Sequence, residues 1–356
     1  MPAYAAFYKK LRLVFKKPVM TSRGPLYHKE TFFLCLADRT NPARLGLGEC
    51  GPLPGLSLDD RADFEAKIAQ VSDLLNAGYS HTEIDLAEFP ALAFGLELAQ
   101  LDWQGGGRQL LFDTEFSRGR QLIPTHGLIW MSDRAGMLQQ VRAKVALGFT
   151  CIKLKVGALD FREECGLLAD IRRTYPPGRI KLRLDANGAF TPGNALARLN
   201  EMTRFDIDAI EQPLKPGQWA EMAVLSRRSP IPIALDEELI GVTNPTEKEL
   251  LLKTIKPAYI VLKPSLVGGF AAAKEWIDAA QQLGIGWWTN SMLESNVGLS
   301  AICQWVSALE TTITHGLGTG QLYANNIHSP IRLAKAGLIY DRNRSWDLSG
   351  IVKNYD

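Results

Sequence analysis

Several features that would assign a protein to a broad class are missing from this 356-residue chain. It has no uninterrupted apolar run of about 18 residues, so we expect no membrane partner. Lysines flank the short apolar stretch at the N-terminus, which is not the pattern of a secretory signal. No G-x-G-x-x-G or P-loop pattern joins a strand to a helix, so the usual signatures of nucleotide binding are absent.

The net charge is small and cysteines are few. The net charge is +2 and no long basic block occurs, so we expect no nucleic-acid partner. The five cysteines are scattered, odd in number and form no C-x-x-C pair, so we interpret them as reduced thiols of a cytoplasmic protein. The composition, 46% hydrophobic and 22% charged, is that of an ordinary globular protein.

The first part of the chain, residues 1–110, predicts a small α+β unit. Apolar alternation predicts three strands, and helical spacing of apolar residues predicts two helices after them. Two loops rich in glycine, proline or polar residues interrupt these elements. The expected strands are 7–15, 31–37 and 44–50, the helices are 59–76 and 91–104, and the loops are 20–28 and 51–57.

A regular alternation of short β-rich runs and helical segments follows, over residues 120–325. Strands that alternate with helices pair in parallel through right-handed crossovers, and eight of them predict a β/α barrel. The tail, residues 330–356, is expected to return and pack on the N-terminal unit. The expected strands are 122–130, 151–156, 181–184, 209–211, 231–235, 259–262, 286–289 and 314–317, with helices at 134–147, 162–175, 193–204 and 271–283.

Three carboxylates end three consecutive barrel strands: Asp185, Glu211 and Asp236. The C-terminal strand ends of a barrel lie together and carry its active site. Like charges at that spacing repel unless a cation lies between them, and hard oxygen ligands suit Mg²⁺, with Mn²⁺ as the alternative. A helix cap or loop position explains one such carboxylate better than a metal does, but not three in register.

Three lysines flank these carboxylates. Lys153 and Lys155 share one face of the second strand, because side chains alternate with period two, and Lys263 ends the sixth strand. A lone lysine at a barrel rim is more often a solvated side chain. Lysines beside a metal can act as a base and stabilise an enediolate, the anion formed when a proton next to a carboxylate is removed.

The strand-end residues resemble those of the enolase superfamily, in its muconate-cycloisomerase-like subgroup. Segments 152–156, 184–188, 210–213, 235–237 and 263–264 match in order and spacing, and the match spans nearly the whole chain. Superfamily sites use a Lys or His base with Mg²⁺. The resemblance implies a (β/α)₇β modified TIM barrel with an N-terminal α+β capping domain, whose loops 20–28 and 51–57 close over the substrate.

The resemblance also implies a role for each residue. Asp185, Glu211 and Asp236 would bind the metal. Lys155 would be the general base, Lys153 would lower its pKa and bind the substrate carboxylate, and Lys263 would lie on the opposite face of the substrate. Asn187 and Glu237 would surround the metal ligands without binding the metal themselves.

Within the subgroup, segments 291–295 and 318–322 resemble o-succinylbenzoate synthases. This implies a lyase of menaquinone biosynthesis, which dehydrates 2-succinyl-6-hydroxy-2,4-cyclohexadiene-1-carboxylate. Dipeptide epimerases usually carry Asp-x-Asp at the eighth strand to hold an ammonium, whereas this chain has Gly318-Thr319-Gly320. An N-acylamino-acid racemase, a dipeptide epimerase or a cycloisomerase on the same scaffold stays open, as does a barrel that binds a carboxylate without turnover.

The substrate partner is therefore a small carboxylate, and Arg23, Ser291 and Asn187 are the candidates to bind it. His126 and His315 fall inside barrel strands, where we interpret them as interior histidines rather than metal ligands. The sequence leaves room for a homo-oligomer.

Overall fold

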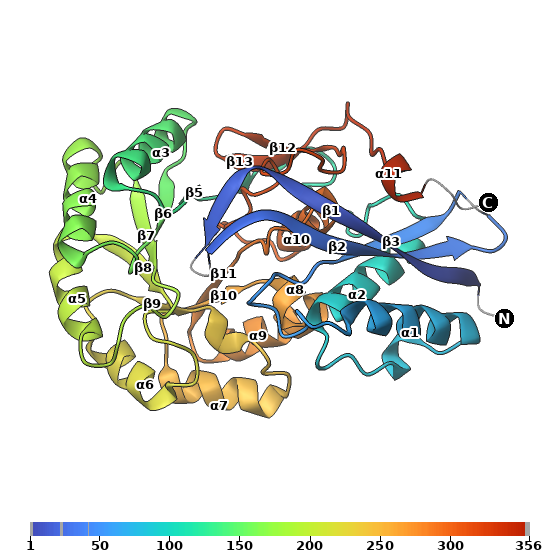
Figure 1. The fold of residues 1–356 in the computed structure, drawn as a ribbon, viewed down its shortest axis with the longest axis horizontal. Coiled ribbons are helices and arrows are strands. Elements are labelled where there is room, and N and C mark those ends of the chain that lie inside the picture. The colour runs from blue at the N-terminus through green and yellow to red at the C-terminus, as the bar shows by residue number, and fades with distance from the viewer. Residues whose placement is uncertain (1–2, 22–23, 42, 353–356) are drawn as a thin grey trace.

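The computed structural model describes residues 3–21, 24–41 and 43–352 of the chain (Figure 1). The N-terminal unit is an antiparallel sheet of β1 (Tyr4–Thr21), β2 (Gly24–Asp38) and β3 (Leu45–Cys50), in that order. Two helices and one 3₁₀ turn complete it: α1 (Phe64–Ala77), η1 (His81–Glu83) and α2 (Pro90–Gln104). We refer to this unit as the cap.

The expected loop at 20–28 is wrong, because β1 and β2 are longer than the alternation predicts. Their pairing continues to Thr21 opposite Gly24, with a bulge between Val14 and Val19. The two strands therefore project as a hairpin beyond the sheet. Of its described residues between Lys16 and His28, Val19 alone is buried, so this part lacks the alternation of buried and exposed side chains by which a strand is recognised.

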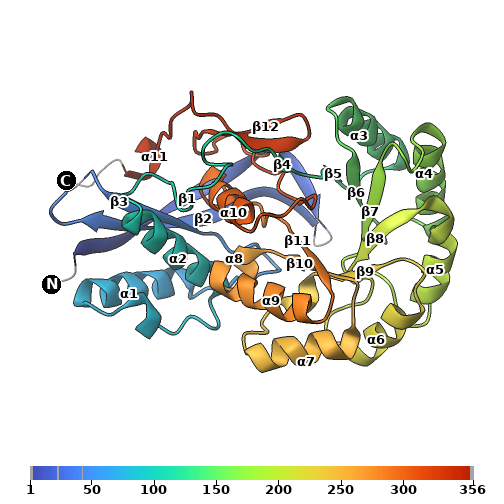
Figure 2. The same cartoon turned by 180° about the vertical axis from the view of Figure 1, so that it is seen from behind.

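A parallel sheet of seven strands forms the barrel, in the order β11-β10-β9-β8-β7-β6-β5. Each strand is followed by a helix on the outside, as Figures 1 and 2 show. The strands are β5 (Gly127–Ile129), β6 (Cys151–Lys155), β7 (Lys181–Asp185), β8 (Ile207–Glu211), β9 (Ile233–Leu235), β10 (Tyr259–Leu262) and β11 (Gly286–Thr289). The helices are α3 (Arg134–Ala146), α4 (Phe161–Thr174), α5 (Ala195–Met202), α6 (Trp219–Arg228), α7 (Pro245–Ile255), α8 (Pro264–Val267), α9 (Phe270–Gln282) and α10 (Asn296–Ala308), with 3₁₀ turns η2 (Thr203–Phe205) and η3 (Glu237–Leu239).

The predicted barrel-and-cap fold is confirmed, with two corrections at the seam of the barrel, where its first and last segments meet. Segment 122–130 is not one strand, since β4 (Ile123–Pro124) pairs with the tail and only β5 joins the barrel. Segment 314–317 forms no strand and closes the barrel through two parallel bridges, Asn290 with Gly316 and Thr125 with His315. The Thr125 hydroxyl also bonds across this seam, to the His315 carbonyl at 3.0 Å and from the Leu317 N–H at 2.8 Å.

The C-terminal tail contacts both parts of the molecule. β12 (Ile331–Ala334) and β13 (Gly337–Tyr340) form a hairpin that pairs with β4. Beyond it, Trp346, Leu348 and Ile351, the last in α11 (Ser349–Val352), pack in one cluster with Phe33 and Leu47 of the cap. Figure 1 shows α11 beside the cap sheet.

The apolar interior is divided between the two parts. The largest cluster fills the space between the barrel strands and their helices, and a separate cluster lies between the cap sheet and helices α1 and α2. The division into a cap, 1–110 with tail 330–356, and a barrel, 120–325, stays a prediction. No helix of the described residues has the length and apolar character needed to cross a membrane.

Candidate active site

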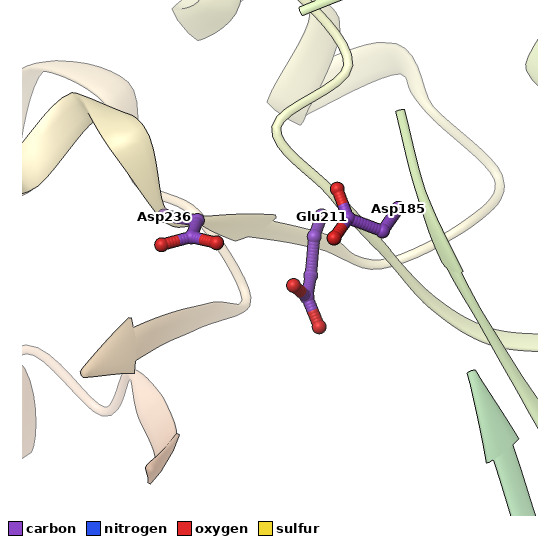
Figure 3. A group of neighbouring side chains, drawn as sticks. All are labelled: Asp185, Glu211 and Asp236. Atoms are coloured by element: carbon purple, nitrogen blue, oxygen red, sulfur yellow. The ribbon is translucent and has the colours of Figure 1, made fainter. Parts of the chain in front are cut away.

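The three predicted carboxylates lie together at the C-terminal ends of adjacent barrel strands (Figure 3). Asp185 is the last residue of β7, Glu211 is the last of β8, and Asp236 follows β9. One oxygen from each lies within 4.8 Å of the other two, and all three residues are buried. The strand ends thus converge on one acidic centre, as the sequence predicts.

Two oxygens of this cluster have no protein partner. Among the described residues, Oε1 of Glu211 and Oδ1 of Asp236 are buried and accept no hydrogen bond. Leaving buried carboxylate oxygens unpaired is costly, because desolvation removes the water that would bond them. A divalent cation with oxygen preference would satisfy both oxygens, so the donor set fits Mg²⁺ or Mn²⁺.

Lys153 is the innermost of the three lysines. Its ammonium lies 2.9 Å from Asp185 Oδ2 and forms a closer ion pair with Glu211 Oε2. Burial lowers the pKa of Lys153, but the carboxylates of Asp185 and Glu211 outweigh burial, so the net pKa lies above the ordinary value. Lys153 is therefore a fixed positive charge at the acidic centre.

Lys155 lies nearer the opening, on the same face of β6. Its Nζ donates to Asp185 Oδ2 at 2.7 Å and to Asn187 Oδ1 at 2.6 Å. The Asn187 amide also donates to Glu237 Oε1 at 2.7 Å. These contacts fix the direction of the Lys155 side chain, which retains 15% of its side-chain exposure.

Lys263 approaches the cluster from the other side. It follows β10, whereas Lys155 is on β6, and the three carboxylate-bearing strands lie between them. Its Nζ donates to Asp236 Oδ2 at 2.6 Å. Burial lowers the pKa of Lys263, but the carboxylates of Asp236 and Glu237 raise it by more, so the net pKa lies above the ordinary value.

The pKa values of Asp185 and Glu211 are shifted in opposite directions by this environment. Burial raises the pKa of Asp185, but Lys153 and Lys155 outweigh it, and the net pKa lies well below the ordinary value. Burial also raises the pKa of Glu211, and with Asp185 and Asp236 nearby the net pKa stays raised despite Lys153. Lys153 therefore does not fully offset the burial and the neighbouring carboxylates that disfavour the charged form of Glu211.

A pocket opens above this centre and is covered by the cap. Thr21 at the end of the β1–β2 hairpin and Leu53 and Leu56 of loop 51–57 line it on the cap side. The barrel contributes the lysines and a wall of apolar and polar side chains. These are His126, Leu128, Trp130, Lys153, Lys155, Asp185, Asn187, Glu237, Lys263, Asn290, Ser291, Met292, Leu293, Gly316 and Thr319.

The predicted substrate-binding residues have three different placements. Arg23 lies outside the described residues. Ser291 lines the pocket, but its hydroxyl donates to Glu294 Oε2 at 2.5 Å and lies 2.7 Å from the Thr319 hydroxyl. Asn187 lines the pocket with its amide bonded to Lys155 and Glu237. The substrate roles of all three stay predictions.

Sequence reasoning missed a buried charged network between cap and barrel. Lys29 of β2 is fully buried and donates to the carbonyls of Met292 and Leu293 at 3.2 and 3.1 Å. Glu49 of β3 accepts from Ser295, at 2.8 Å from its N–H and 2.6 Å from its hydroxyl. Both cap residues therefore hold the loop after β11, which walls the pocket. Nothing local marks them, because their partners lie more than two hundred residues away in the chain.

Two family models match the chain. The model described as "Enolase C-terminal domain-like" matches residues 136–335, and "MenC, N-terminal domain" matches residues 4–103. The first covers the strands that carry the acidic centre, and the second covers the cap.

Known proteins similar to the chain fall into the same group. It is 43% identical to the o-succinylbenzoate synthase of Desulfotalea psychrophila, over 90% of this chain and 95% of that protein. The crystal structure of MenC from Desulfotalea psychrophila LSv54 superposes with a TM-score of 0.84 at 40% identity, covering 94% of this chain and 99% of that one. The N-succinylamino acid racemase of an Amycolatopsis species is 28% identical, over 82% of this chain and 80% of that protein.

Proposed function

The chain belongs to the enolase superfamily, as its strand-end residues predict, and on that premise we propose that it is an o-succinylbenzoate synthase. The proposed reaction converts 2-succinyl-6-hydroxy-2,4-cyclohexadiene-1-carboxylate into o-succinylbenzoate and water, a step of menaquinone biosynthesis. The enzyme is a carbon–oxygen lyase in this proposal.

One observation carries the proposal: a lysine amine aimed into a covered pocket beside a buried acidic centre. Lys155 is held by Asp185 and Asn187 at 2.7 and 2.6 Å, so its Nζ has a defined position at the pocket wall. A base must lie within hydrogen-bond reach of the proton that it removes. A substrate whose carboxylate points at the acidic centre would present its adjacent C–H to this lysine.

The proposed steps use each lysine differently. The free amine of Lys155 takes the proton from the ring carbon that bears the carboxylate, and the electron pair is delocalised into that carboxylate. The hydroxyl then leaves with a proton returned by Lys155, which gives water and an aromatic ring. Lys153 is a fixed charge for the substrate carboxylate, and Lys263 lies over the opposite face of the ring, where a cation–π contact stabilises it.

A divalent cation bound by Asp185, Glu211 and Asp236 would supply positive charge to the substrate carboxylate and so favour removal of the adjacent proton. We propose Mg²⁺, with Mn²⁺ as the alternative. The three carboxylates and the unpaired oxygens of Glu211 and Asp236 support this choice.

The polar lining supports a substrate without an ammonium group. In the described part of the pocket, the acidic lining residues are Asp185 and Glu237, and both lie beside the acidic centre. The wall near the eighth segment offers Gly316 and Thr319 instead of a carboxylate. We keep Arg23 as the proposed partner of the succinyl carboxylate, with Ser291 and Asn187 as further contacts.

A racemase is the second candidate. Lys155 and Lys263 lie on opposite sides of the acidic centre, which is the arrangement that proton removal from one face and return to the other requires. A similar protein, from Amycolatopsis, is named for racemisation of N-succinylamino acids. A cytoplasmic location and a homo-oligomer stay predictions.

Identification of the product tests the proposal. The Mg²⁺-loaded chain is mixed with the diene, loss of diene absorbance is followed, and the product is identified by mass spectrometry; we expect o-succinylbenzoate. Incubation with N-succinylamino acids in D₂O measures the second activity. Deuterium uptake without conversion of the diene would replace the lyase by the racemase.

A further inference from the structure

The turn that follows β11 lines the pocket and has a strained backbone. Met292 and Leu293 both contribute to the pocket wall. Leu293 has a φ of 61°, in the left-handed region that residues with a side chain rarely adopt. Such a conformation is costly and persists only where the surrounding structure holds it. The contacts of this turn, which we call the 292–293 turn, therefore determine the shape of that wall.

The part of the turn that faces the barrel is held by neighbouring side chains. The Leu293 N–H donates to the Ser291 hydroxyl at 3.0 Å, and the Met292 N–H donates to Glu294 Oε2 at 2.8 Å. The Leu293 carbonyl accepts from the Tyr323 hydroxyl at 2.7 Å. The N–H groups of the turn are thus satisfied locally, and its carbonyls remain to be held from outside.

The cap holds these carbonyls through a single side chain. Lys29 is fully buried, and its Nζ donates to the carbonyls of Met292 and Leu293 at 3.2 and 3.1 Å. The first carbonyl belongs to the peptide before Leu293 and the second to the peptide after it. Because peptides are planar, one partner shared by both carbonyls fixes φ and ψ of the residue between them.

Lys29 also lies against the cap side of the pocket wall. A Cβ at Gly51, the first residue of loop 51–57, would lie 2.9 Å from Lys29 Nζ. Leu53 of this loop lines the pocket and packs in one buried apolar cluster with both side chains of the 292–293 turn. The amine therefore lies where the cap wall and the barrel wall of the pocket meet.

We infer that Lys29 is a positioning residue that sets the affinity of the pocket for its substrate, an inference that rests on the proposed function. Its two hydrogen bonds keep Leu293 in the left-handed conformation, and the apolar wall of Leu53, Met292 and Leu293 then has the shape that binds the ring. Lys29 itself is not among the residues that line the pocket. Its role is therefore in substrate binding and not in proton transfer.

Steady-state kinetics of Lys29→Met test this role. We expect KM for the diene to rise by about 10-fold, the size of one good hydrogen bond. A rise in KM at constant kcat marks lost binding that substrate and transition state share, so kcat should stay within about twofold of the wild type. A purely structural role would lower the active fraction, and with it kcat, at unchanged KM; that result would overturn the inference.

Lys248→Met is the matched control. Lys248 is also buried, and its Nζ also donates to a main-chain carbonyl, that of Ala272 at 3.4 Å, besides pairing with Glu275. These contacts join α7 to α9, and Lys248 does not line the pocket. We expect wild-type KM in this variant. An equal rise in both variants would assign the effect to the loss of any buried lysine.

A double-mutant cycle shows whether Lys29 acts through the turn. Glycine adopts the left-handed conformation readily, so in Leu293→Gly the backbone no longer needs to be held. Lys29→Met should then raise KM by less than about threefold in the Leu293→Gly background, because substitutions that act through one element are not additive. The same fold-change in both backgrounds would contradict the inference.

Tyr323→Phe provides the test if Lys29→Met does not fold, as its melting temperature would show. This substitution removes one oxygen atom and the other hydrogen bond to the Leu293 carbonyl. KM should rise in the same direction with kcat retained. Unchanged KM in Tyr323→Phe would then overturn the inference.

The proposed function and this inference can fail separately. If the wild type consumes the diene and Lys29→Met keeps its KM, the function stands and the inference is wrong. If the wild type consumes no diene but exchanges N-succinylamino acids in D₂O, the proposed function fails, and the same rise in KM is expected for that exchange. A wild type active on neither overturns both.

Discussion

At the scale of single residues, Lys155 is the proposed base, and its side chain is held by Asp185 and Asn187. Replacing Lys155 with alanine should lower kcat by at least about 1000-fold, because a positioned base contributes on that order. Mn²⁺ binding, followed by electron paramagnetic resonance, should persist, since all three carboxylates remain. Retained turnover would show that another group removes the proton.

The carboxylates make a separate prediction. Glu211→Gln should weaken Mg²⁺ binding by at least about 100-fold, a loss that even groups behind the ligands of a metal site can cause. Calorimetric titration of the chelator-treated protein with Mg²⁺ measures this affinity. Asp208→Asn is the matched control, because Asp208 is on the same strand but forms its ion pairs with Lys181 and Arg183. Equal losses in the two variants would argue against a direct ligand.

The residue types at the acidic centre could be predicted because each follows an apolar run at a strand end. Asp185, Glu211, Asp236 and Lys263 follow this rule, and the structure brings them together. Lys29 and Glu49 gave no such signal, because each lies within a cap strand and its partners lie in the distant loop after β11.

At the scale of elements, helix α2 begins at a buried carboxylate. Asp59 has no exposed surface, and its Oδ2 accepts from the N–H groups of Ala91 and Leu92 at 2.7 and 3.4 Å. Burial raises the pKa of Asp59 from 3.8 to about 6, although these N–H groups oppose the shift. The folded chain therefore binds a proton here more tightly than the unfolded chain.

This shift predicts a pH dependence with a definite sign. The stabilising effect is complete below the unfolded pKa of 3.8 and is lost as pH rises through about 6, about 3 kcal/mol in total. Asp59→Asn does not titrate, so the stability difference between wild type and variant should shift against the wild type from pH 4 to pH 6. Urea unfolding at several pH values measures it. Parallel profiles would contradict the raised pKa.

Helix α2 also packs very closely on strand β3. A Cβ at Gly48 would lie 1.8 Å from the Gly95 carbonyl oxygen, which is backbone and cannot rotate away. Gly48→Ala should therefore destabilise the chain by at least about 2 kcal/mol, as overpacking does. Thermal unfolding checks this. Gly178→Ala is the control, because no atom lies within 4 Å of its Cβ position, and equal effects would refute the close packing.

Element prediction failed where the pattern depends on distant partners. The parallel barrel strands are largely buried, and six of the seven were predicted, whereas the expected strand 122–130 merged β4 with β5. Segment 314–317 was also predicted as a strand, yet its bonds are shared between the Thr125 hydroxyl and two isolated bridges. The prediction of a loop in place of the β1–β2 hairpin was wrong for another reason, because the exposed residues of this hairpin have the composition of a loop.

At the scale of the whole molecule, the pocket belongs to both cap and barrel. The cap supplies Thr21, Leu53 and Leu56 to its lining, and Lys29 and Glu49 hold the barrel loop that walls it. The resemblance to the superfamily implied that the cap covers the site. It did not reveal the buried charges of Lys29 and Glu49 that hold cap and barrel together, since their contacts form only in the folded state.

The dependence of turnover on bound metal shows whether the acidic centre takes part in the reaction. The chelator-treated chain is titrated with Mg²⁺ while consumption of the diene is followed, and bound Mg²⁺ is measured in parallel by calorimetry. We expect background turnover without metal and a rate that rises in proportion to occupancy of one ion per chain, because one cluster of Asp185, Glu211 and Asp236 is present in the described residues. Full turnover in the metal-free chain would contradict it.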